Sequence, residues 1–182
     1  MIKVLIFLLF FPPSLGLLWQ IIQVEDLSFK LIAIATILIC LDQARMAVID
    51  LDNINLGKKE LQDSRLDRFY QITIITIIIE LLGFYCTYFW LGWGAILILF
   101  SQVYFNSLVN IKIDTKPQFL IENKSIQDKI LILLIDISAI IMVALWIFNI
   151  YSLTIAIILL SLVLIYEIIK YNSEVNKNGE IF

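Results

Sequence analysis

The sequence contains no histidine and comparatively little charge. Of its 182 residues, 16% are charged, two are cysteine and none is histidine. Without histidine, the common zinc sites, histidine-dependent nucleophiles and histidine-ligated haem are excluded. A water-soluble domain carries about 25% charged residues, so this chain has too few charges to cover a surface that faces water. The formal net charge of −3 also argues against nucleic acid as a partner.

Hydrophobic residues make up 61% of the chain, against roughly 45–50% in a soluble protein. They form six long runs, at residues 2–20, 29–49, 70–89, 93–111, 130–148 and 153–169. A helix needs about 20 mostly apolar residues to cross a bilayer, and only helices and closed barrels satisfy their backbone in lipid. None of the runs alternates as a barrel strand does. The pattern predicts an all-α polytopic membrane protein, with residues 1–182 as a single transmembrane domain of six helices.

The connections between the runs differ in length. Three are short: residues 23–28, 90–92 and 149–152. The other polar stretches are longer: the loops 50–69 and 112–129 and the tail 171–182. Short connections join antiparallel neighbours, so we expect three helical hairpins separated by the two loops.

Lysine and arginine predict the orientation, because loops on the cytoplasmic side are enriched in them. They gather on the side of the long loops and the chain ends: Lys3, Lys58, Lys59, Arg65, Arg68, Lys112, Lys116, Lys124, Lys129, Lys170 and Lys177. The opposite side carries Lys30 and an aromatic belt of the kind found at membrane interfaces: Trp19, Trp90, Trp93 and Trp146. We expect both termini on the cytoplasmic side of a prokaryotic inner membrane, or of an equivalent organelle or thylakoid membrane.

The first run has two interpretations. Its basic start, apolar core and small residues at positions 14–16 fit a cleaved signal peptide, and cleavage would leave five spans. The apolar run continues past Gly16 to Ile22, which favours a retained first helix. In that helix Pro12 and Pro13 predict a kink, because proline removes a backbone donor and clashes with the preceding turn.

Four ionisable residues lie well inside the runs, away from their ends: Asp42, Arg45, Glu80 and Asp136. Insertion of a charged side chain at mid-helix costs about 2.5–3.5 kcal/mol, so each is a candidate functional group. Asp42 and Arg45 are spaced i, i+3 and can pair. Arg45 also reaches Asp136 if the second and fifth helices touch. Because three acids face one arginine, we expect one or two of the carboxyl groups to be neutral at pH 7, Glu80 first.

An amide stripe on the fourth run, Gln102 and Asn106, faces the acid of the third run. The two runs form one hairpin, so Gln102 lies at a depth similar to that of Glu80, and we expect a hydrogen bond between them. The candidate polar network therefore consists of Asp42, Arg45, Glu80, Gln102, Asn106 and Asp136. It has two interpretations: a proton or cation path, or hydrogen bonds that hold helices together.

A second candidate site lies at the cytoplasmic mouth. Asp50 and Asp52 offer oxygen ligands of the kind that divalent cations prefer, although an acid-rich loop is the commoner origin of such a sequence. The rest of the sequence predicts no catalytic residue, no cofactor and no structural metal.

Three functions fit these patterns. The small size and the lack of catalytic residues favour a non-enzymatic subunit or assembly factor of a larger membrane complex, with other membrane proteins or further copies of the chain as partners. The alternative is a small transporter or channel protomer that uses Glu80 and Asp136 as protonatable or cation-binding groups. A lipid-active enzyme using Asp50 and Asp52 is the third. The direction of Glu80 and of the amide face of the fourth run is the most useful observation. Inward and dry favours hydrogen bonds that hold helices together, inward and wet favours transport, and outward demands a partner chain.

Overall fold

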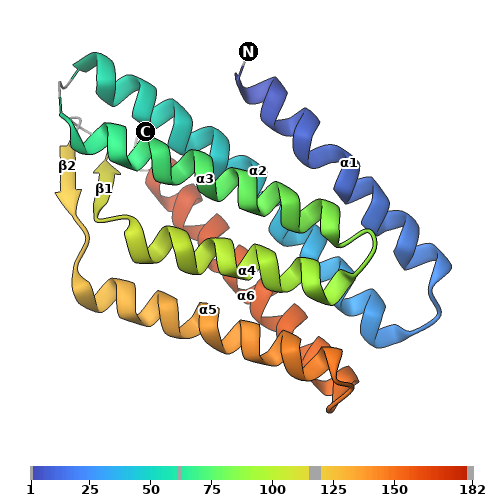
Figure 1. The fold of residues 1–182 in the computed structure, drawn as a ribbon. Coiled ribbons are helices and arrows are strands. Elements are labelled where there is room, and N and C mark those ends of the chain that lie inside the picture. Colours follow the sequence, from blue (N-terminus) through green and yellow to red (C-terminus); the bar gives the residue numbers. More distant parts are fainter. Residues whose placement is uncertain (1, 61–62, 115–119, 180–182) are drawn as a thin grey trace.

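Six helices account for most of the computed structural model, which describes residues 2–60, 63–114 and 120–179 (Figure 1). In chain order they are α1 (Ile2–Gln23), α2 (Leu27–Glu60), α3 (Arg65–Cys86), α4 (Leu91–Leu108), α5 (Ile126–Ile147) and α6 (Ser152–Gly179). All six are long and apolar enough to cross a membrane. The all-helical class and the six apolar runs expected from the sequence are therefore confirmed.

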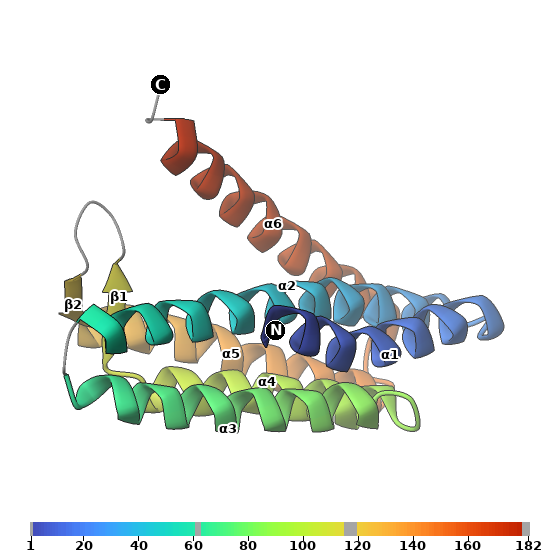
Figure 2. The ribbon, with the colours of Figure 1, turned by 90° about the horizontal axis from the view of Figure 1, so that it is seen from above.

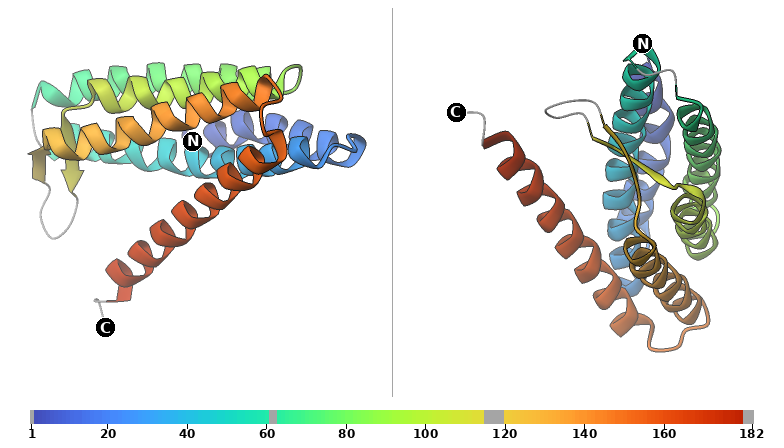
Figure 3. Two further views of the ribbon diagram at one scale, coloured as in Figure 1. Left: turned by 90° about the horizontal axis from the view of Figure 1, so that it is seen from below. Right: turned by 90° about the vertical axis from the view of Figure 1, so that its left-hand side faces the viewer.

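The helices form two layers and one outlier. Helices α1 and α2 pack together in one layer, and α3, α4 and α5 form the second (Figure 2). Helix α6 packs on α2 but leans away from both layers toward its C-terminal end (Figures 2 and 3). The turns that follow α1, α3 and α5 lie at one end of the molecule, and the α2–α3 connection lies at the other. We call these the turn end and the far end.

A small antiparallel sheet stands at the far end, where the sequence suggested only a polar loop. Strand β1 (Ile111–Asp114) pairs with β2 (Leu120–Asn123), with Ile113 opposite Ile121. Ile111 is buried against Ile54 and Leu66, which lie at the ends of α2 and α3. The isoleucines of the two strands explain the difference, because Ile111, Ile113 and Ile121 cover the helix ends while the paired Lys112 and Glu122 lie on the other face.

Helix α2 continues to Glu60, so residues 50–60 are helical instead of belonging to the predicted loop 50–69. The extension is amphipathic: Leu51 and Ile54 are buried, and Lys58 and Lys59 lie in the last turn. Lysine there stabilises the helix by complementing the negative end of its dipole. The loop 112–129 is likewise shortened, by the sheet and by the start of α5.

Helix α1 runs without interruption through Pro12 and Pro13. Pro13 has no N–H to offer the carbonyl of Leu9, one turn earlier. The hydroxyl of Tyr85, on α3, donates to that carbonyl at 3.3 Å. A neighbouring helix thus replaces the hydrogen bond that proline removes, as membrane helices require.

Glycine brings α3 and α4 into backbone contact. A Cβ added to Gly94 would lie 2.5 Å from the backbone nitrogen of Thr87 and 2.7 Å from the carbonyl oxygen of Gly83. A Cβ on Gly83 would lie 3.0 Å from the backbone nitrogen of Ile98. Small residues at such crossings allow close approach between helices in lipid. The hairpin is therefore tightly closed near its turn.

Candidate functional site

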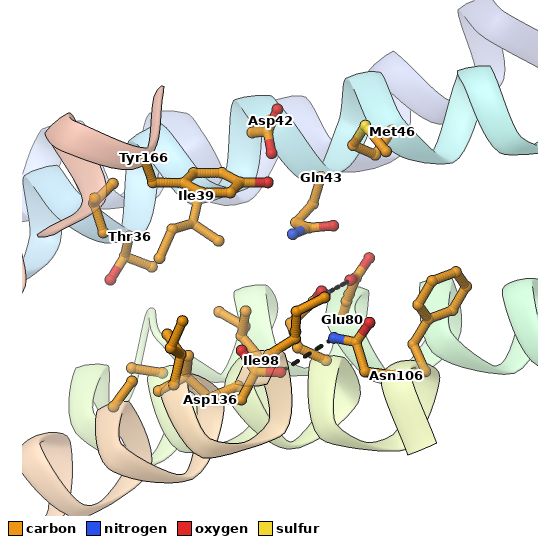
Figure 4. A pocket seen from close by; sticks show the side chains of 18 of the residues that line it. Thr36, Ile39, Asp42, Gln43, Met46, Glu80, Ile98, Asn106, Asp136 and Tyr166 are labelled. Atoms are coloured by element: carbon orange, nitrogen blue, oxygen red, sulfur yellow. Dashed lines mark hydrogen bonds between the residues drawn. The ribbon is translucent and has the colours of Figure 1, made fainter. Parts of the chain in front are cut away.

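A cavity of about 760 Å³ lies between the two layers. Its walls come from α2 and α6 on one side and from α3, α4 and α5 on the other (Figure 4). In the close view Gln43 points from α2 toward Glu80 on the opposite wall. The polar side of the third and fourth helices therefore faces inward, onto the space between the two layers.

Glu80 sits on the wall formed by α3 and is 2% exposed. The amide of Gln102, on α4, donates to its Oε1, and the hydroxyl of Ser101 lies 3.5 Å from the same oxygen. The hydrogen bond predicted between Gln102 and Glu80 is thus present. It depends on the close crossing at Gly83 and Gly94, which brings the two helices to hydrogen-bonding distance.

Asp136 lies on α5 beside the same wall. The amide of Asn106, on α4, donates to its Oδ2 at 3.1 Å. The sequence suggested Arg45 as a partner for this carboxylate, whereas the partner seen here is an amide of the adjacent helix. Helix α4 therefore supplies a neutral donor to the acid of each neighbour: Gln102 to Glu80 and Asn106 to Asp136.

Asp42, on α2, belongs to a different kind of cluster. Its side chain is 2% exposed and accepts from Arg45 at 2.9 Å, as the i, i+3 spacing predicted. It also binds the ammonium of Lys170 on α6, at 2.7 and 2.5 Å from its two oxygens. Two cations thus neutralise Asp42, and the ion pair with Lys170 ties α6 to α2.

The cavity is polar toward the far end and apolar toward the turn end. The polar and charged half includes Asp42, Gln43, Asp50, Glu80, Gln102, Asn106, Lys124, Asp136 and Glu167. The apolar half is lined mainly by aliphatic residues, among them Ile32, Ala35, Ile39, Ala95, Ile98, Leu99, Ala139, Met142, Val143 and Leu159. The division is clearest on α2, α4 and α6. On α5 apolar lining residues flank Asp136 on both sides, and α3 contributes no lining residue on the turn-end side of Glu80.

Asp50 and Asp52 do not converge. Two residues apart on a helix, they project to different sides: Asp50 lines the cavity, and Asp52 pairs with Lys3 of α1 at 2.7 Å. Throughout the described ranges no group of three or more histidine, cysteine, aspartate or glutamate side chains is placed to hold a metal ion. The geometry therefore gives no support to a shared cation site at these two residues.

Sequence reasoning missed two charged groups of this region, Glu167 and Lys170. Glu167 lies within the sixth predicted span, 153–169, and its position there was the available signal. Lys170 follows that span directly. Its contact with Asp42 depends on where α6 crosses α2, which no local pattern in the sequence reveals.

The arrangement offers carboxyl groups inside a largely apolar cavity. Such groups can take up and release a proton or hold a cation. Comparison of the chain with protein-family models, with curated proteins and with solved structures gives no match. The interpretation of the site therefore rests on its geometry and chemistry.

Proposed function

We propose that the protein is a small integral membrane transporter or channel protomer, in which Glu80 and Asp136 bind a cation or carry a proton. The observation that supports this most is the cavity itself. Both acids lie at its wall, so the polar face of α3 and α4 is turned toward an open space and away from a dry helix contact. Hydrogen bonds that only hold helices together need no such space.

The length of the cavity also supports passage across a bilayer. Its lining residues on α2 run from Ile32 to Asp50, a rise of about 27 Å at 1.5 Å per residue. This approaches the ~30 Å thickness of the hydrocarbon core.

We propose that the far end faces the cytoplasm, which would place both termini on that side. Lys58 and Lys59 of α2, Arg65 and Arg68 of α3 and Lys112 of β1 lie at the far end, which fits the positive-inside rule. The tryptophans at the turn end form the opposite interfacial belt: Trp19, Trp90, Trp93 and Trp146. A prokaryotic inner membrane or an equivalent organelle membrane fits this pattern.

The direct test is proton flux in reconstituted vesicles. Purified protein in liposomes that contain a pH-sensitive dye is expected to dissipate an imposed pH gradient faster than protein-free liposomes. Glu80→Gln keeps the shape and the hydrogen-bonding capacity of the side chain but removes its ionisable group. We expect this variant to lower the flux at least tenfold, with an unchanged melting temperature.

Glu122→Gln is the matched control. Glu122 lies on the exposed part of β2, outside the candidate spans, so the same chemical change there should leave the flux unaltered. Equal flux in wild type and Glu80→Gln would refute a proton path through Glu80. The same comparison with an imposed K⁺ or Na⁺ gradient tests the cation path.

A second candidate function is the membrane subunit or assembly factor favoured by the sequence. Its support is the low burial of two helices: 6% of the α5 span and 17% of the α6 span are buried within the chain, against 28–50% in the other four spans. A partner chain, as well as lipid, can cover such faces. Extraction in a mild polymer should then recover the chain in a stoichiometric complex, and recovery as a lone monomer would contradict a subunit role.

A further inference from the structure

We infer that the cavity binds an amphipathic organic cation, with its charged head between Glu80 and Asp136 and its apolar body in the half toward the turn end. This inference rests on the proposed function and specifies the ligand class of the same site. Three features of the cavity support it: the sign of its charge, the division of its lining, and its opening.

Acidic side chains outnumber basic ones in the cavity lining. Five carboxylates and one lysine, Lys124, line it. Lys170 and Arg45 neutralise Asp42, whereas Glu80 and Asp136 accept from the amides of Gln102 and Asn106. An amide donor holds and orients a carboxylate without cancelling its charge. These two groups are therefore suited to a positively charged ligand.

The division of the lining excludes a bare metal ion as the best ligand. A calcium or magnesium ion needs about six converging oxygens at 2.0–2.6 Å, and no such metal-binding group exists among the described residues. The apolar half, which includes Ile39, Ile98 and Val143, offers nothing to an inorganic ion. It would bury the hydrocarbon part of an organic one, with about 0.8 kcal/mol gained for each CH₂ group.

The size and opening of the cavity agree with such a ligand. Sites for small organic molecules have volumes of about 300–1,000 Å³, and this one measures about 760 Å³. Lining residues of α5 and α6 are also exposed: Leu134 by 58%, Ile135 by 59% and Leu162 by 48%. Since α6 leans away from α5 (Figure 3), the cavity opens sideways between these helices, where a lipid-soluble cation would enter from the hydrocarbon.

Three probes test the head and the body separately: octyltrimethylammonium, octyl sulfate and tetramethylammonium. The first two share a tail and differ in charge, and the third is the cationic head alone. Their binding to the protein in lipid nanodiscs is measured by titration calorimetry, with empty nanodiscs subtracted. We expect saturable binding of octyltrimethylammonium, at least tenfold weaker binding of tetramethylammonium, and no saturable binding of octyl sulfate.

Two variants locate the site. The double variant Glu80→Gln with Asp136→Asn removes both ionisable groups. It is expected to weaken the binding of octyltrimethylammonium at least tenfold. Ala139→Phe fills part of the apolar half. It should lower the affinity for octyltrimethylammonium toward the affinity for tetramethylammonium. Glu122→Gln, outside the cavity, should bind like wild type. Melting temperatures verify that each variant folds.

The outcomes separate the ligand class from the transport function. Equal binding of octyltrimethylammonium and octyl sulfate, or octyltrimethylammonium binding that the double variant leaves unchanged, would overturn the inferred ligand. Proton flux that requires Glu80, without any binding of the octyl cation, would overturn the ligand class and leave the proposed function standing. Saturable cation binding without any flux would support the ligand class and count against transport.

Discussion

The α3–α4 and α5–α6 hairpins share a plan but differ in how closely their helices pack. Each begins with a helix that carries one acid within its apolar stretch, Glu80 or Asp136, and turns within a few residues. The α3–α4 pair is in backbone contact through Gly83 and Gly94. Helices α5 and α6 contain no glycine before Gly179, and they diverge from their turn (Figures 2 and 3).

Side-chain size at the crossing accounts for the difference. Where glycine removes the side chains, two membrane helices approach until their backbones touch. Helices α5 and α6 have no glycine at their contact, and α6 packs more extensively on α2 than on α5. The closed hairpin holds Glu80 in place, and the open one leaves room for the cavity. Rigidity and space are thus supplied by different parts of one chain.

Substitution of Gly94 by valine should have the largest effect, because it breaks the closed hairpin. The new side chain would collide with the backbone of Thr87 and Gly83, and overpacking of this kind costs about 3 kcal/mol. Thermal unfolding in detergent should show the loss. Gly16→Val is the control, since a Cβ there meets only the side chain of Tyr88, at 3.0 Å. Equal losses at both glycines would contradict a special role for the α3–α4 crossing.

Asp42→Asn should have an intermediate effect on stability, because it weakens the ion pair that ties α6 of the open hairpin to α2. It leaves Lys170 and Arg45 facing a neutral amide, and loss of such a charged hydrogen bond costs about 1.5–3 kcal/mol. Helix α6 should loosen from α2, which broadens the distance distribution between spin labels placed at Leu41 and Ile168. The exposed pair of Asp52 with Lys3 provides the comparison: Asp52→Asn should cost less than about 1 kcal/mol. An unchanged label distance in Asp42→Asn would show that other contacts hold α6.

Tyr151→Gly should have the smallest effect, and it should stabilise. Tyr151 adopts a positive φ of 48° in the α5–α6 turn, a conformation that costs a side-chain-bearing residue about 1–2 kcal/mol and glycine almost nothing. We expect a gain below about 1 kcal/mol, seen as a higher melting temperature. Tyr171→Gly, within α6, should instead destabilise by about the helix-propensity cost of glycine. A loss of stability in Tyr151→Gly would show that the tyrosine contributes more than its backbone strain costs.

The sequence was a good guide where one local rule decides the structure. Hydrophobic length predicts six helices, the i, i+3 spacing predicts the pair of Asp42 and Arg45, and the hairpin geometry predicts the bond between Glu80 and Gln102. It was a poor guide where the outcome depends on the crossing of distant helices. The partners of Asp136 and Asp42 are set by where α4 lies beside α5 and where α6 lies beside α2.

The secondary structure of the polar connections was also hard to predict, because the length rule for membrane-spanning helices applies only to the apolar runs. Residues 50–60 continue α2 since Leu51 and Ile54 find a core at the far end of the bundle. The strands around Ile113 and Ile121 form for the same reason. Both signals were present as short amphipathic patterns within segments that were otherwise charged.

The hydrogen bond from the hydroxyl of Tyr85 to the carbonyl of Leu9 has a consequence for the order in which the chain assembles. Until α3 arrives, the first helix carries a carbonyl that its own backbone has no donor to satisfy, because Pro13 stands where the donor would be. In hydrocarbon an unmet carbonyl is costly. Helix α1 therefore reaches its final state only after α2 and α3 have been inserted, and its hydrogen bonding is completed by a residue that the ribosome adds more than seventy positions after Pro13.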